Sequence, residues 1–87
     1  MTTREVAIGH RLGLHARASA KLVRLSGQFH SEISISRADK NRSEPADARS
    51  ILAILLLAAS QGTRVRVQTE GEDEELAMDA VCDYLKG

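Results

Sequence analysis

The residues best suited to chemistry stand in one short segment, Gly13-Leu14-His15-Ala16-Arg17. A neutral imidazole such as that of His15 is a nucleophile that can accept a phosphoryl group. The guanidinium of Arg17 can bind the added phosphate through two parallel N–H donors. Gly13 permits a backbone conformation that other residues avoid. The segment therefore indicates a phosphoryl-accepting histidine with Arg17 to stabilise the charge, and a plain surface histidine is the alternative interpretation.

This segment leads into a helix whose first turn lacks an obvious cap. Apolar residues recur with helical spacing over residues 16–26, and Gly27 is typical of a helix end. No Ser, Thr, Asp or Asn stands directly before the first turn. Free N–H groups at the positive end of a helix dipole favour an anion. We therefore expect the backbone amides of Ala16, Arg17 and Ala18 to bind phosphate.

The elements that must position this segment alternate along the chain. Strands are predicted over residues 4–9, 31–36 and 64–69, a short edge strand near 40–44, and further helices over 51–60 and 72–86. This β-α-β-β-α-β-α order predicts an α+β, open-faced β-sandwich in which an antiparallel sheet carries three helices on one face.

The two faces of the sheet should differ in polarity. The strand residues expected to face water are Glu5, Ser34, Ser36, Arg64 and Arg66. The second helix is apolar all round, which predicts burial on more than one side.

Basic and acidic residues are equal in number, 12 of each, but unevenly placed. Residues 1–69 hold 11 Lys and Arg against 5 acids, a charge of +6, whereas residues 70–87 hold 7 acids against one Lys, a charge of −6. We therefore expect the basic part to face an anionic or acidic partner. Nucleic acid is disfavoured, because only Phe29 and Tyr84 could stack on bases.

Length and composition indicate one cytoplasmic domain spanning residues 1–87. The N-terminus lacks the apolar stretch of a signal peptide, and the longest apolar run, residues 51–59, is shorter than the roughly 20 residues that span a bilayer. We expect no membrane insertion. A single cysteine, Cys82, and the spacing of the three histidines indicate no metal site.

The chain resembles the histidine-containing phosphocarrier protein (HPr) family of the phosphoenolpyruvate-dependent phosphotransferase system, including its nitrogen-branch paralogues. The residues that carry the resemblance are Gly13 to Arg17, EVAI at 5–8, GQFHSEISI at 27–35, Arg49 to Leu52, Ser60 to Thr63 and Glu70 to Glu75. The element order predicted above is also similar to the fold of this family.

The resemblance implies a carrier rather than an independent turnover enzyme. His15 would be phosphorylated on Nδ1 by enzyme I, which takes the group from phosphoenolpyruvate, and would pass it to an enzyme IIA-type acceptor. Arg17 would stabilise the phosphohistidine, and no cofactor is implied. The pathway, either sugar transport or metabolic and nitrogen regulation, stays open.

Two departures from the family pattern stand out. The family usually has proline where this chain has Ala18, so a fixed φ is missing and an N–H is added. We expect a less fixed first turn with the chemistry retained. The stretch from Ser36 to Arg49 is also a few residues longer than usual, with Pro45 inside it.

Ser50 matches the regulatory serine of the family, which would add a serine kinase or phosphorylase to the partners. Its alternative interpretation is an ordinary N-cap, and the two are compatible. The family docks its partners with the helix that follows, which points to Ile51, Leu52 and Leu55, with core filling as the alternative. Lys21 and Arg24 continue the Arg17 face and could meet an acidic partner or simply be solvated.

Two other classes of function compete with the carrier. One is a non-catalytic regulatory docking module of the same fold, against which the intact His15 and Arg17 argue. The other is a ferredoxin-like domain that binds RNA or a metabolite, against which the two aromatic residues argue.

Overall fold

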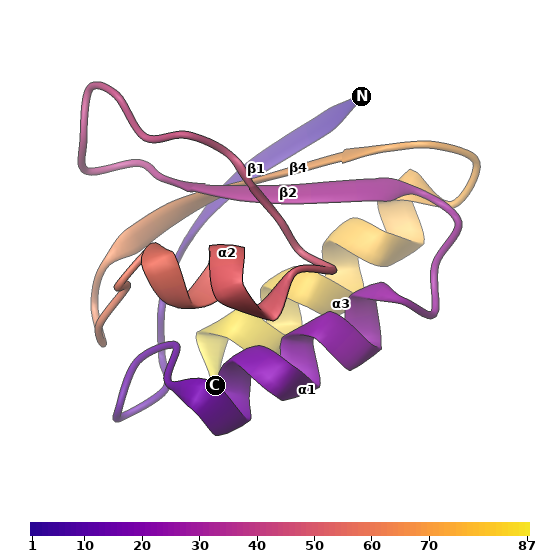
Figure 1. Cartoon of the computed structure of the whole chain (residues 1–87). Coiled ribbons are helices and arrows are strands. Elements are labelled where there is room, and N and C mark those ends of the chain that lie inside the picture. The colour runs from indigo at the N-terminus through magenta and orange to yellow at the C-terminus, as the bar shows by residue number, and fades with distance from the viewer.

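Four strands form one antiparallel sheet in the computed structural model, which describes residues 1–87. The elements are β1 (Thr2–Ala7), α1 (Ala16–Ser26), β2 (Glu32–Arg37), β3 (Ala46–Asp47), α2 (Ile51–Leu56), β4 (Arg64–Glu70) and α3 (Glu74–Lys86). The strands lie in the order β1-β4-β2-β3, and all three helices lie on one face of the sheet (Figure 1). The predicted open-faced sandwich is therefore confirmed. None of the helices has the length and apolarity needed to cross a membrane.

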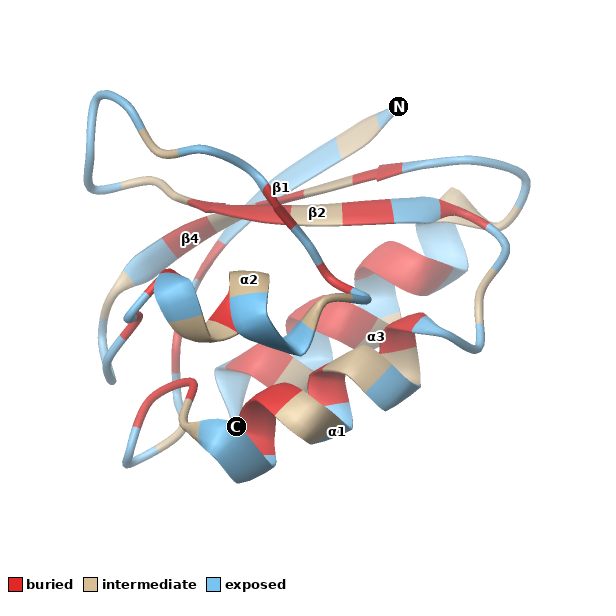
Figure 2. Ribbon diagram, viewed as in Figure 1, coloured by how far each residue is buried: buried red, intermediate tan, exposed pale blue.

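The core fills the space between the sheet and the helices (Figure 2). Alternate residues of β4, namely Val65, Val67 and Thr69, are buried on the helical side. Leu22 of α1 and Met78 of α3 are fully buried in the same layer. The period of two in β4 is what a strand with one covered face requires.

The strand residues predicted to face water are accessible to solvent, with the exception of Ser36. Glu5 and Arg64 are exposed, Ser34 and Arg66 are half-buried, and Glu5 forms ion pairs with Arg66 at 3.1 Å and Arg64 at 3.7 Å. Ser36 is only 8% exposed, so its predicted exposure is wrong. It lies directly opposite Arg66 in the ladder between β2 and β4, a pairing that places a long side chain beside a short one.

Strand boundaries differ from the predicted ones because pairing, rather than alternation, sets them. β1 spans Thr2–Ala7 instead of residues 4–9, since the chain turns away when the Gly9 amide donates to the Leu85 carbonyl at 2.8 Å. β2 starts one residue later than predicted, at Glu32, and β4 continues to Glu70, its partner across the ladder.

The edge strand predicted near residues 40–44 is wrong in position. β3 is Ala46–Asp47, which pairs with Ser34 and Ile35 of β2. The residues between β2 and β3 form a loop instead, in which the Arg37 amide donates to the Ser43 hydroxyl at 2.9 Å.

α2 is shorter and more exposed than predicted. It ends at Leu56, because Ala58 adopts a left-handed conformation with φ of 51° that stops a right-handed helix. Only Ile54 of this helix is buried, so the predicted burial on more than one side is wrong. α2 contacts α1 and β3, and no further layer of the protein covers its outer face, which is therefore exposed to water.

α3 begins at Glu74 rather than at residue 72, and the acid before it serves a neighbouring loop. The Asp73 carboxylate accepts hydrogen bonds from the amides of His30 (3.0 Å) and Ser31 (2.9 Å) and from the Ser31 hydroxyl. These bonds, the one from the Ser31 hydroxyl above all, hold the pKa of Asp73 below its usual value. Asp73 thus ties the start of α3 to the loop before β2.

We predict that Asp73 contributes to the pH dependence of stability. Because folding lowers its pKa, the contribution is present above the unfolded pKa, about 4, and is lost as the pH falls through the lower folded pKa. Between about pH 5 and pH 2, the free energy of unfolding measured with urea should fall less steeply for Asp73→Asn than for wild type. The control Glu75→Gln changes an exposed acid and should keep the wild-type slope; equal slopes for Asp73→Asn and wild type would contradict the prediction.

Candidate functional site

His15 lies where the β1–α1 loop meets α1. It takes the N-cap position with an extended backbone (φ −76°, ψ −178°), and no side chain caps the helix. The first hydrogen bond of the helix is formed by the Ser19 amide, which donates to the His15 carbonyl at 2.8 Å. The amides of Ala16, Arg17 and Ala18 therefore have no partner within α1. The predicted uncapped helix start is confirmed.

The side chains at this site are free of competing partners. The His15 ring is half-buried, and only the His10 ring, among the three histidines, forms a hydrogen bond. Arg17 is exposed and enters no ion pair within the chain. Unpartnered amides, a helix dipole and a nearby cation together favour an anion at this position.

The loop that presents His15 is fixed by the segment that follows α2. The Leu14 amide donates to the Ala59 carbonyl at 2.9 Å, and the Ser19 hydroxyl donates to the Leu14 carbonyl at 3.1 Å. Gly13 has φ of +70°, and a Cβ there would lie 2.5 Å from the Ala59 carbonyl oxygen. Only glycine allows this approach, so Gly13 sets the direction in which the chain reaches His15.

The segment after α2, which contacts the His15 loop, is anchored in turn by Arg37 at the end of β2. The Arg37 guanidinium donates to the carbonyls of Leu57 (3.2 Å) and Ala58 (3.3 Å) at the end of α2. Asp39 orients that guanidinium through two hydrogen bonds of 2.9 and 2.7 Å, which lower the pKa of Asp39 and raise that of Arg37. A contact chain thus runs from β2 through the end of α2 to the His15 loop.

Ser50 is the N-cap of α2. Its hydroxyl accepts a hydrogen bond from the Ala53 amide at 3.3 Å, and the residue is half-buried. The predicted capping role is confirmed.

Apolar side chains gather next to this cap. Ile51 is 42% and Leu52 64% exposed, whereas Leu55 is half-buried. Leu56, which was not predicted as a contact residue, is 75% exposed and lies one helical turn after Leu52. Its spacing of four residues from Leu52 places both side chains on one helix face, and this was the sequence signal that could have identified it. We call Ile51, Leu52 and Leu56 the α2 apolar surface.

Lys21 and Arg24 are exposed on α1, and neither forms an ion pair. With Arg17 they form a row of unpaired cations along one helix. The structure therefore leaves this row free for an acidic partner, as well as for solvent.

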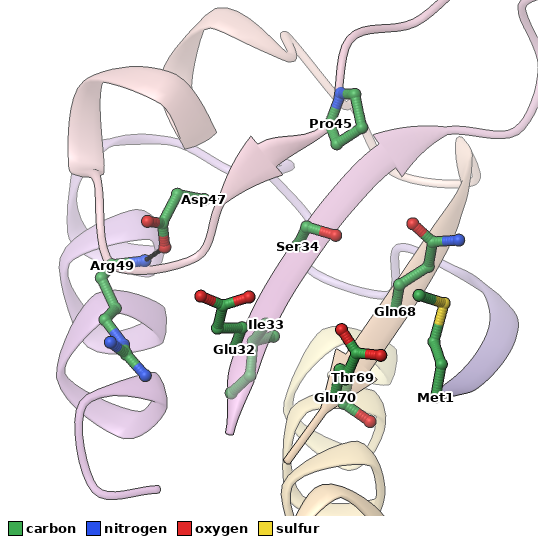
Figure 3. Close-up of a pocket in the computed structure, with 10 residues that line it drawn as sticks. All are labelled: Met1, Glu32, Ile33, Ser34, Pro45, Asp47, Arg49, Gln68, Thr69 and Glu70. Carbon is green, nitrogen blue, oxygen red and sulfur yellow. Dashed lines mark hydrogen bonds between the residues drawn. The ribbon is translucent and has the colours of Figure 1, made fainter. Parts of the chain in front are cut away.

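One hollow of the molecule lies away from His15. A cavity of about 340 Å³ is lined by strands β2, β3 and β4 and their ends, and contains no residue of α1 or the His15 loop (Figure 3). Glu32 and Glu70 lie directly opposite each other at this end of the sheet, and Asp47 also lines the hollow. These three carboxylates outnumber Arg49, the one basic side chain that lines the hollow, so it does not suit a phosphoryl group.

Comparison with known proteins places the chain in one family. The family model described as "PTS HPr component phosphorylation site" matches residues 2–87. The phosphocarrier protein HPr of Cupriavidus necator is 46% identical over 98% of this chain and 91% of its own, and the phosphocarrier protein NPr of Shewanella violacea is 39% identical over 91% and 82%. The crystal structure of an HPr from Bacillus anthracis superposes with a TM-score of 0.87 at 32% identity, covering 97% and 95% of the two chains.

The open-faced sandwich and the matched relatives place the chain among the phosphocarrier proteins. The chain belongs to the HPr family of phosphocarrier proteins of the phosphotransferase system. Family membership implies partners within that system, such as enzyme I and enzyme II components.

We predict that Gly13→Ala destabilises the fold by about 2 to 4 kcal/mol, since a Cβ would both clash with Ala59 and occupy a left-handed conformation. The matched control is Gly62→Ala, where φ is +88° but nothing lies within 4 Å. That control should cost only about 1 kcal/mol of conformational strain. Chemical denaturation measures both, and equal losses would show that the contact with Ala59 does not restrain the loop.

Proposed function

We propose that His15 accepts a phosphoryl group from phosphorylated enzyme I, the group coming originally from phosphoenolpyruvate, and passes it to an enzyme IIA-type acceptor. The observation that carries this proposal is the position of His15 as N-cap of a helix whose first three amides have no partner in the helix. The family to which the chain belongs supports it further.

The chemistry of the transfer needs little from the protein besides geometry and charge. Nδ1 of His15 supplies the electron pair for a new N–P bond, while the bond between phosphorus and its donor on enzyme I breaks and its electrons stay with the donor. The second transfer runs the same way, with the acceptor as the nucleophile and the His15 ring as the leaving group. No metal ion or nucleotide enters either step.

The residues around His15 would divide the work of holding the phosphoryl group. The amides of Ala16, Arg17 and Ala18 would donate to its oxygens, and the Arg17 guanidinium would supply a full positive charge. Arg17 is exposed, so the group stays open to a second protein while it is bound. A carrier requires both properties, because it must hold the group and then release it.

We predict that incubation with phosphoenolpyruvate and enzyme I adds one phosphate that is acid-labile and base-stable, as expected of phosphohistidine. Intact-mass spectrometry should show this addition for wild type and none for His15→Ala. The matched control is His30→Ala, which removes another histidine that is exposed and should label like wild type. Labelling of His15→Ala at the wild-type level would overturn the assignment.

We further propose that enzyme I and the acceptor dock on the surface around His15. Ile51, Leu52 and Leu55 of α2 would supply apolar contacts, and Lys21 and Arg24 would supply charge. Exposed apolar side chains beside unpaired cations suit a partner that presents an apolar area with acidic residues around it.

Ser50 would act as a switch within this surface. A phosphate added by a serine kinase carries a charge of about −1.5 to −2 at pH 7 and would lie next to Ile51 and Leu52. An acidic partner would be repelled, while the cap could be kept by a phosphate oxygen. A phosphorylase would reverse the change.

We predict that Ser50→Asp lowers kcat/KM for phosphoryl transfer from enzyme I about tenfold, through like-charge repulsion at the docking surface. Ser50→Asn is the matched control, because Asn caps a helix as well as Asp but adds no charge. Steady-state transfer assays at low and high salt should show the difference between the two variants shrinking as salt rises. Identical rates for both variants would contradict the proposed switch.

A further inference from the structure

One residue near the end of α3, Tyr84, contacts both ends of the loop that presents His15. The Tyr84 hydroxyl donates to the Ala18 carbonyl, in the first turn of α1, at 2.9 Å. The Tyr84 carbonyl lies 2.7 Å from Nε2 of His10, near the start of the loop, and the two rings are 4.8 Å apart at a tilt of 48°. Its place in the apolar pattern of α3 gives no sign of these two contacts.

The contact with His10 has a defined direction. A carbonyl oxygen only accepts hydrogen bonds, so Nε2 of His10 must carry the proton. Next to it, the Gly9 amide donates to the Leu85 carbonyl at 2.8 Å. The last turn of α3 therefore anchors the beginning of the loop through two hydrogen bonds.

The second contact, from the Tyr84 hydroxyl to the Ala18 carbonyl, lies in the first turn of α1, which has few restraints of its own. α1 has no side-chain cap and no acidic residue in its first turn, and Ala18 does not fix φ as proline would. Its first turn is held instead by contacts from other residues, namely the bond from Ser19 to Leu14 and the bond from Tyr84 to Ala18. Burial also raises the pKa of Tyr84, so its phenol keeps the proton that it donates.

We propose that Tyr84 is a positioning residue for phosphoryl transfer, and that its hydroxyl fixes the first turn of α1 so that the amides of Ala16, Arg17 and Ala18 converge on the phosphoryl group. This inference rests on the proposed role of His15. Tyr84 itself does not touch the reacting atoms: it acts through the Ala18 carbonyl.

Tyr84→Phe tests the proposal by removing only the hydroxyl, since the ring next to His10 remains. We expect kcat for transfer from enzyme I to fall about threefold to tenfold, the worth of one hydrogen bond. KM for enzyme I should stay unchanged, because the docking side chains on α1 and α2 are untouched. Inorganic phosphate, titrated against the amide NMR signals of residues 16–18, should bind more weakly by a similar factor.

Thr69→Val is the matched control for a general loss of stability. The Thr69 hydroxyl likewise makes a part-buried hydrogen bond to a backbone carbonyl, that of Glu74, at 2.9 Å, but at the opposite end of α3. Its loss should lower the unfolding midpoint by a similar amount and leave both kcat and phosphate affinity at the wild-type values.

The outcomes separate this proposal from the one on which it rests. Wild-type protein that gains no phosphate on His15 would overturn the proposed function, and the phosphate titration would still test the role of Tyr84. Normal labelling of wild type, with Tyr84→Phe unchanged in kcat and phosphate affinity, would overturn the positioning role alone. A rise in KM only, or an equal fall in kcat for Thr69→Val, would overturn it as well.

Discussion

The whole site depends on hydrogen bonds that hold the β1–α1 loop from parts of the chain far away in sequence. The Gly9 amide bonds to Leu85 in α3, and the Leu14 amide bonds to Ala59 after α2. A loop with few bonds of its own is fixed in this way by the two elements on either side of it. The histidine can then stand at an uncapped helix end, where a free loop would let the unpaired amides turn toward water instead.

The charges of the chain are arranged differently in space than in sequence. The acidic C-terminal part is only partly neutralised: Asp79 pairs with Arg4 at 3.2 Å and Glu74 with the N-terminal amine at 3.2 Å. β1 thereby neutralises part of α3. The cations of α1 have no such partners, so the side of the molecule that carries His15 keeps its positive charge. The division between +6 and −6 in the sequence thus becomes an unpaired basic helix beside a partly neutralised acidic one.

The sequence predicted well those features that are local. The bounds of α1, residues 16–26, follow from helical spacing and from Gly27, and the missing cap is visible in the residue types themselves. β3 could not be located, because a strand of two residues has no pattern and exists only through its pairing with β2. The exposure of α2 could not be predicted for a related reason. Its residues are apolar on every side, so the sequence does not show which of them face the core and which face water; that depends on how the helix packs in the fold. The hydroxyl of Tyr84 lies at an apolar position of its helix, and no spacing within α3 reveals that it reaches α1.

The contacts that hold the loop suit the proposed role of a small carrier that serves two partners. Most of them use backbone groups. The side chains involved act from neighbouring elements: the Tyr84 hydroxyl bonds to the first turn of α1, and Arg37 bonds to the end of α2, next to the segment that holds the loop. The side chains on the surface around His15 are therefore not needed for its position. A protein of 87 residues is too small to enclose a substrate, but this arrangement lets it fix one histidine while leaving the surrounding surface for recognition. Substitutions on the α2 apolar surface should consequently change which partner docks without moving the histidine that we propose as the phosphoryl acceptor.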